Sequence, residues 1–134
     1  MDASLLYVSR RAATDADVRD IVETSRARNA QLQVTGALAA SRGWFSQILE
    51  GPRSAVDALM DSIRRDRRHS GVEVLVYEDI ERRRFPGWTL AYSGAAEFVD
   101  GLIRALADRT TPEPHPADLR RLIQAIEEFA RARP

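Results

Sequence analysis

The sequence of 134 residues contains no cysteine and no lysine. Without cysteine there can be no disulfide, thiolate nucleophile or cysteine-ligated metal, and a reducing compartment such as the cytoplasm is favoured. Without lysine there can be no Schiff base and no P-loop lysine. The two histidines, His69 and His115, are too few for a convincing zinc site. These absences remove several classes of enzyme before any motif is considered.

The chain also lacks an excess of charge of either sign and any long apolar run. Its 20 cationic residues, all arginine, balance 20 acidic residues, which argues against general affinity for nucleic acid. No apolar run is long enough to cross a bilayer, and we see no signal peptide. We therefore expect a cytoplasmic protein with no contact to membrane or nucleic acid. The length fits one domain with a helical appendage.

Alternating strand and helix patterns fill the first two thirds of the sequence. Thr14 is the expected N-cap of a first helix that fades near Asn29, and Ser54 is the expected N-cap of a second. Strands are predicted at residues 4–9, 33–41, 44–50, 72–77 and 88–92. The order β-α-β-β-α-β-β predicts an α+β, ferredoxin-like sheet with both helices on one face.

Residues 94–134 supply two further helical patterns, separated by the proline-rich segment 110–116. The strand at 44–50 is apolar at both parities, so both faces of the sheet should be covered. The C-terminal helices or a second subunit would cover the face opposite the first two helices. We expect a core domain at 1–93 and a helical extension at 94–134.

Three polar residues stand out against this apolar pattern. By period two, Gln47 shares a face with Phe45 and Leu49, so its amide should point into apolar surroundings. Tyr7 lies in the middle of the first strand, and Asn29 lies at the end of the first helix. Each alone also fits an ordinary role: a satisfied core amide, a core tyrosine and a helix-capping asparagine. Together they suit a planar, amide-rich ligand between two helices on a sheet.

Several motifs resemble the BLUF family, the flavin-binding sensors of blue light. Residues 28–51 (RNAQLQVTGALAASRGWFSQILEG) contain an asparagine, a Thr-Gly pair that opens a strand, and the pattern Phe-x-Gln-x-Leu-Glu-Gly. An early Tyr-x-Ser (Tyr7 and Ser9), RDRRH at 65–69 and RRFPGW at 83–88 follow the same family pattern. The matches span residues 4–93 in order, which is a stricter test than one motif.

This resemblance implies a role for each matched residue. Tyr7 would donate an electron and a proton in the photochemistry, and Gln47 would change its rotamer or tautomer in light. Trp88 would help signal transfer in the fifth strand, where Leu90 replaces a methionine often found in the family. The implied cofactor is FAD, with FMN or riboflavin as alternatives. The implied flavin-binding residues are Tyr7, Ile21, Ser25, Arg28, Asn29, Gln47, Arg65, Asp66 and His69.

The resemblance further implies a stand-alone photoreceptor that is not itself an enzyme. It would signal through the fifth strand and the C-terminal helices to a separate downstream protein, as a homodimer or higher oligomer. Two alternatives remain open from the residues alone. One is a flavin-free dimerisation module on the same fold. The other is an acylphosphatase-like hydrolase, which the lack of a glycine-rich phosphate cradle after the first strand disfavours.

Overall fold

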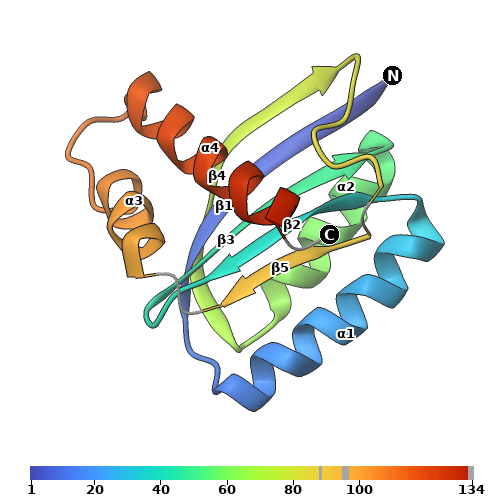
Figure 1. Ribbon diagram of the computed structural model, residues 1–134, viewed down its shortest axis with the longest axis horizontal. Helices are drawn as coiled ribbons and strands as arrows, with labels where there is room; N and C mark the ends of the chain where they lie inside the picture. The colour runs from blue at the N-terminus through green and yellow to red at the C-terminus, as the bar shows by residue number, and fades with distance from the viewer. Residues whose placement is uncertain (88, 95–96, 133–134) are drawn as a thin grey trace.

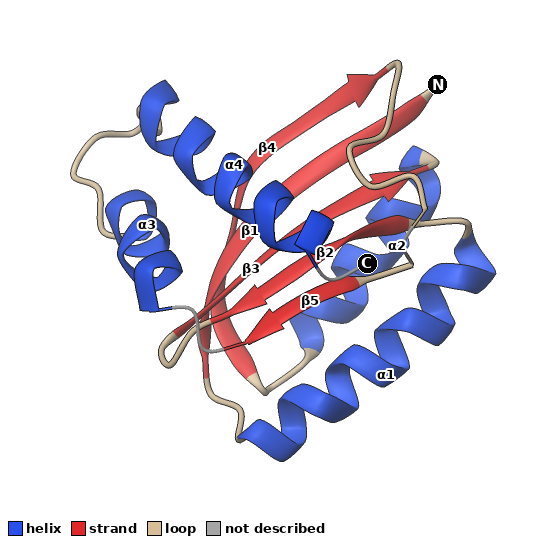
Figure 2. Cartoon of the chain, in the orientation of Figure 1, coloured by secondary structure: helices blue, strands red, loops and turns tan. Residues whose placement is uncertain are grey.

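The computed structural model describes residues 1–87, 89–94 and 97–132 of the chain. It contains one five-stranded sheet with helices on both faces (Figure 1, Figure 2). The elements in chain order are β1 (Asp2–Arg11), α1 (Asp15–Leu32), β2 (Thr35–Ala40), β3 (Trp44–Gly51), α2 (Arg53–Arg65), β4 (His69–Ile80), β5 (Ala91–Gly94), α3 (Glu97–Ala107) and α4 (Pro116–Ala132).

The sheet has the strand order β4-β1-β3-β2-β5. β1 pairs with β3 and β4, and β2 pairs with β3, all antiparallel, which is the arrangement of a ferredoxin-like core. β5 is added at the edge, parallel to β2. The predicted fold class is confirmed. The predicted bounds of the fifth strand are wrong: β5 begins at Ala91, so Leu90 precedes it, and Trp88 lies outside the described residues.

The two faces of the sheet have separate hydrophobic cores. On one face, α1 and α2 pack over residues such as Leu5, Leu49 and Phe45. On the other face, Leu6 and Ile48 share a core with side chains of α3 and α4. Figure 2 shows α4 lying across the sheet on the side opposite α1 and α2. The C-terminal helices, one of the two covers that the sequence left open, therefore occupy this face.

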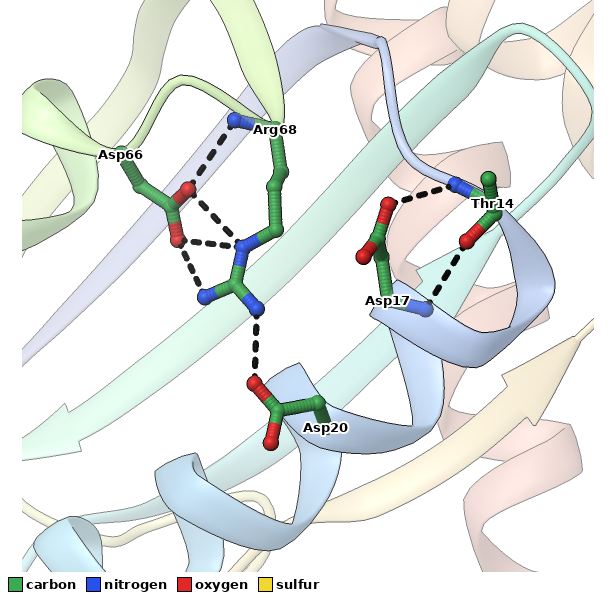
Figure 3. A network of polar contacts seen from close by, with 5 residues as sticks. All are labelled: Thr14, Asp17, Asp20, Asp66 and Arg68. Carbon is green, nitrogen blue, oxygen red and sulfur yellow. Dashed lines mark hydrogen bonds and ion pairs between the residues drawn. The ribbon is translucent and has the colours of Figure 1, made fainter.

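One of the three predicted helix ends is confirmed, and the other two differ in the structure. Thr14 caps α1 through a capping box, in which its side chain accepts from the Asp17 N–H and the Asp17 carboxylate accepts from the Thr14 N–H (Figure 3). α1 continues past Asn29 until Gln33, which adopts the left-handed conformation at φ 58°. The expected cap at Ser54 is wrong. Pro52 is the N-cap, and Ser54 lies inside the first turn because α2 already begins at Arg53.

No helix in the described part of the chain has the length and apolar character needed to cross a bilayer.

Candidate functional site

Tyr7 and Gln47 lie opposite each other on β1 and β3 and are joined by a hydrogen bond. The two residues are register partners, and the Tyr7 hydroxyl donates to Gln47 Oε1 at 2.6 Å. Both side chains are buried, with 3% and 5% of their surface exposed. Burial raises the pKa of the Tyr7 hydroxyl well above its ordinary value, and the negative charge of Asp66 raises this pKa further. The phenol therefore holds its proton in the resting protein and points it at the amide.

These two side chains line a cavity of about 330 Å³ on the face of the sheet that α1 and α2 cover. The volume lies at the lower end of the range of about 300–1,000 Å³ that is usual for ligand pockets. Strand residues form its floor, and residues of α1 and of the C-terminal end of α2 form its walls. The lining residues are Tyr7, Ile21, Thr24, Ser25, Arg28, Leu38, Phe45, Gln47, Ser62, Ile63, Arg65, Asp66, Arg68 and His69.

The free end of the Gln47 amide makes this cavity suitable for a ligand with carbonyl and ring-nitrogen acceptors. Gln47 Oε1 is occupied by Tyr7, and the amide nitrogen carries two further N–H donors. Among the described residues, none accepts a hydrogen bond from that nitrogen. Its N–H groups can therefore take acceptors from a bound ligand. A flavin ring, which presents carbonyl oxygens and ring nitrogens along one edge, would supply them.

His69 anchors the start of β4 beside the Tyr7 ring. One ring nitrogen lies 2.8 Å from Ser9 Oγ, and the other lies 2.5 Å from the Ile63 carbonyl oxygen. The imidazole meets the rings of Tyr7 and Phe45 edge-on, with centroids 6.2 and 6.0 Å apart. His69 therefore ties together β1, α2 and the two aromatic residues of the cavity floor.

An ion-pair network joins α1 to the loop between α2 and β4, and two of its residues, Asp66 and Arg68, line the cavity (Figure 3). Arg68 pairs with Asp66 at 2.8 Å in its own loop and reaches Asp20 on α1 at 2.9 Å. The hydrogen bonds from Arg68 hold the pKa of Asp66 below its ordinary value. This network fixes the distance between α1 and the end of α2 at one end of the cavity.

Eight of the nine predicted flavin-binding residues line the cavity. Arg28 and Arg65 lie at its exposed rim, and neither forms an ion pair with another described residue. Asn29 is the exception. Its side chain is buried and its amide nitrogen donates to the Thr89 carbonyl oxygen at 2.7 Å, away from the lining set. Direct contact between these residues and a flavin stays a prediction, for Asn29 as for the others.

Sequence reasoning missed six lining residues: Thr24, Leu38, Phe45, Ser62, Ile63 and Arg68. Two of these carried a usable signal. Phe45 has the parity of Gln47 in β3, and Leu38 pairs with Gln47 across β2 and β3. Arg68 had none, because nothing in RDRRH separates the arginine that reaches α1 from its neighbours.

Comparison with known proteins identifies the family. The protein-family model described as "BLUF: Sensors of blue-light using FAD" matches residues 3–91. The chain belongs to the BLUF family. The matched segment runs from the second residue of β1 to the first residue of β5 and contains every residue that lines the cavity. BLUF domains bind flavin, so the expected cofactor, FAD, is confirmed for the family.

Curated relatives carry this BLUF segment inside much longer proteins. Photoactivated adenylate cyclase subunit beta of Euglena longa is 40% identical over 90 residues, which are 65% of this chain and 10% of that protein. Subunit alpha of the Euglena gracilis enzyme is 35% identical over 107 residues, which are 78% of this chain and 10% of that protein. The chain therefore spans about a tenth of the length of these relatives.

Solved structures share the whole BLUF fold with this chain, including its C-terminal helices. The dark-state structure of BlrB, a BLUF protein, has a TM-score of 0.77 and 34% identity and covers 95% of this chain and 96% of that one. A bacterial light-regulated adenylyl cyclase has a TM-score of 0.69 and 28% identity and covers 98% of this chain but 35% of that one. BLUF domains are sensory modules, and cyclase activity resides in separate fused domains.

Proposed function

We propose that this BLUF protein is a blue-light photoreceptor in which Tyr7 and Gln47 carry out the primary reaction on a flavin held in the cavity. The observation that supports this most directly is the 2.6 Å hydrogen bond from the Tyr7 hydroxyl to Gln47 Oε1. This bond places an oxidisable phenol and a reversible amide together at the cavity wall. Arg28 and Arg65 at the rim would face the polar end of the cofactor, where its phosphates emerge.

The bound flavin supplies absorption of blue light and an acceptor for one electron. Tyr7 gives up an electron and then its hydroxyl proton, which leaves along the existing hydrogen bond toward Gln47. Electron and proton both return to Tyr7 when the charge separation recombines, so the net chemistry is zero. Gln47 is left with its amide reversed, by rotation or by tautomerisation. If rotation occurs, the amide N–H donates to the Tyr7 oxygen and Oε1 faces the cavity as an acceptor.

Two states of one amide suit a switch because they need differ little in free energy. Each orientation of Gln47 gives Tyr7 one hydrogen bond, so one light event can bias the equilibrium between them. Phe45 and Leu38, both buried, present apolar surface to the cavity beside the pair. Exclusion of water matters because a water molecule could hydrogen-bond to the Gln47 amide in either orientation. The two orientations would then no longer differ in their hydrogen bonds.

The signal would leave the site through β5 and the C-terminal helices and reach a downstream protein partner. β5 pairs with β2, and Leu38 of β2 is the register partner of Gln47 on β3. Only β2 therefore separates β5 from the strand that carries Gln47. We propose a cytoplasmic, homodimeric photoreceptor whose own chain catalyses no turnover. The relatives named for adenylate cyclase activity carry the same sensory segment on longer chains.

The proposal is tested by light-minus-dark absorption spectra of the purified protein. We expect a yellow protein whose flavin band shifts reversibly to longer wavelength in blue light. Tyr7→Phe removes only the hydroxyl and should retain flavin while losing the shift. Tyr77→Phe is the matched control, because the Tyr77 hydroxyl bonds to Asp57 on α2, away from the cavity lining. A normal shift in Tyr7→Phe, or a wild-type protein that takes up no flavin, would contradict the proposal.

A further inference from the structure

Two adjacent arginines, Arg83 and Arg84, form a polar seam between the sheet and α4. They lie in the segment between β4 and β5, on the sheet face that α4 covers. Arg83 donates to Asp2 at 2.8 Å and to Thr35 at 3.2 Å, which ties β1 to β2. Arg84 donates to Ser4 Oγ at 3.2 Å and also reaches α4. The seam therefore links the sheet to the C-terminal helix by charge as well as by apolar packing.

Glu50 of β3 binds this segment through its carboxylate. It is fully buried on β3, and its Oε1 accepts the backbone N–H groups of Arg84 at 2.6 Å and Phe85 at 3.1 Å. Its second oxygen, Oε2, is buried and has no hydrogen-bond partner among the described residues. A buried carboxylate oxygen without a donor is unfavourable, so a donor that can move toward it has a reason to do so.

The guanidinium of Arg84 is that donor, and three carboxylates share it. It lies 3.6 Å from Glu50 Oε2, 3.9 Å from Glu78 on β4 and 3.3 Å from Glu127 on α4. None of these three distances is that of a short charge-assisted hydrogen bond. A displacement of less than about 1 Å toward Glu50 would complete one such bond. The contact with Glu127 is made by Nε of the same rigid guanidinium, so this displacement moves both contacts together.

We propose that Arg84 is a switch residue that exchanges Glu127 for Glu50 and thereby loosens α4 when the cavity is in its light state. Glu50 follows Gln47 by three residues on β3 and points to the opposite face of the sheet. A shift of β3 that accompanies reversal of the Gln47 amide moves Glu50 and the backbone N–H groups it holds. Arg84 then completes its bond to Glu50 Oε2 and releases Glu127.

This route differs from the route through β5, because it runs through the neighbouring segment and ends on α4 directly. Phe85 is buried in the same core as Ile126 and Ala130 of α4, so the segment and the helix pack as neighbours. The inference rests on the proposed function. Its test therefore reads the primary reaction and the behaviour of α4 separately.

The experiment measures amide hydrogen exchange of residues 122–131 in the flavin-loaded full chain, in the dark and under blue light, beside the absorption shift. We expect light to accelerate exchange in this part of α4 by about two- to fivefold, the factor that loss of one partly exposed ion pair would produce. An absorption shift without any change in α4 overturns the switch and leaves the proposed function standing. An absent absorption shift overturns both.

Two variants test Arg84 itself. Arg84→Met keeps the apolar stem and removes the charge, whereas Glu127→Gln keeps the shape of the partner on α4. Both should show a normal absorption shift, fast α4 exchange already in the dark and no further change in light. Arg131→Met is the matched control, because Arg131 pairs with Glu127 at 3.4 Å but is not a partner of Glu50. A light response of α4 that survives in both variants, or that Arg131→Met abolishes equally, overturns the proposal.

Discussion

Tyr7 and Gln47 meet because they are register partners on neighbouring antiparallel strands, β1 and β3. The pairing Tyr7↔Gln47 sets their backbones opposite each other, and the separate pairing of β3 with β2 places Gln47 opposite Leu38. One amide is thus held between a phenol on one side and an apolar residue on the other. The geometry of the switch is a property of the sheet.

Gln47→Leu removes the acceptor of the Tyr7 hydroxyl and the reversible amide together. We expect flavin to remain bound and the light-induced absorption shift to disappear. Because the Tyr7 hydroxyl is then buried without a partner, the free energy of unfolding should fall by about 1–3 kcal/mol. Difference spectra and urea denaturation measure the two effects. Gln31→Leu, an exposed glutamine of α1, should change neither, and a full shift in Gln47→Leu would refute the role of the amide.

Acid should weaken the ion-pair network at the end of the cavity. Asp66 has a lowered pKa in the folded protein, so its ion pair stabilises the fold above the unfolded value of about 3.9 and this contribution is lost as the pH falls through the lowered pKa. Asp66→Asn should therefore flatten the fall in melting temperature on acidification below about pH 4. Asp61→Asn is the control, because Asp61 pairs with no described residue. Equal slopes in wild type and Asp66→Asn would count against the network.

Gly36 and Gly101 should respond in opposite directions to alanine. A Cβ at Gly36 would overlap the carbonyl oxygen of Ile48 on the neighbouring strand, so we expect Gly36→Ala to cost about 1–3 kcal/mol. Gly101 is exposed inside α3 with open space around it, so Gly101→Ala should add about 0.5–1 kcal/mol. Chemical denaturation compares both with wild type. A neutral Gly36→Ala would show that β2 and β3 can separate at no cost.

Glu50→Ala should destabilise the protein more than a surface glutamate substitution. Its removal leaves the backbone N–H groups of Arg84 and Phe85 without the acceptor they have now, at about 1–3 kcal/mol for each group that water cannot reach. Glu23→Ala on the exposed side of α1 is the comparison and should stay within about 0.5 kcal/mol of wild type. Urea midpoints measure both. A Glu50→Ala protein as stable as Glu23→Ala would mean that water replaces the carboxylate.

The order of elements could be predicted from the sequence because local signals for it were strong. The apolar parity of the strands and the Thr14 N-cap required no tertiary information. The ends of β4 could not be predicted from the sequence pattern, because His69 and Ile80 are flanked by polar residues. They belong to the strand only because they pair with β1. β5 was placed too early, since its bounds depend on pairing with β2 at residues Ala91–Gly94.

The site could be predicted where its residues share a strand face. It could not be predicted where a contact depends on the path of a loop. Gln47 and Tyr7 could be placed together by strand parity and by family resemblance. Asn29 was expected at a helix end, yet it lies inside α1 and bonds to Thr89, a residue 60 positions away that no local pattern connects to it. The burial of Glu50 ran against the usual exposure of glutamate, so nothing in the sequence drew attention to it.

The shared core beneath α3 and α4 bears on any attempt to transplant this sensor onto another protein. The family segment ends at residue 91, but Leu6, Ala37 and Ile48 of the sheet are covered by side chains from beyond that point. A fusion cut at the family boundary would present this apolar surface to solvent and invite self-association. The portable unit is the sheet together with both of its helical covers, and a graft should be joined after α4.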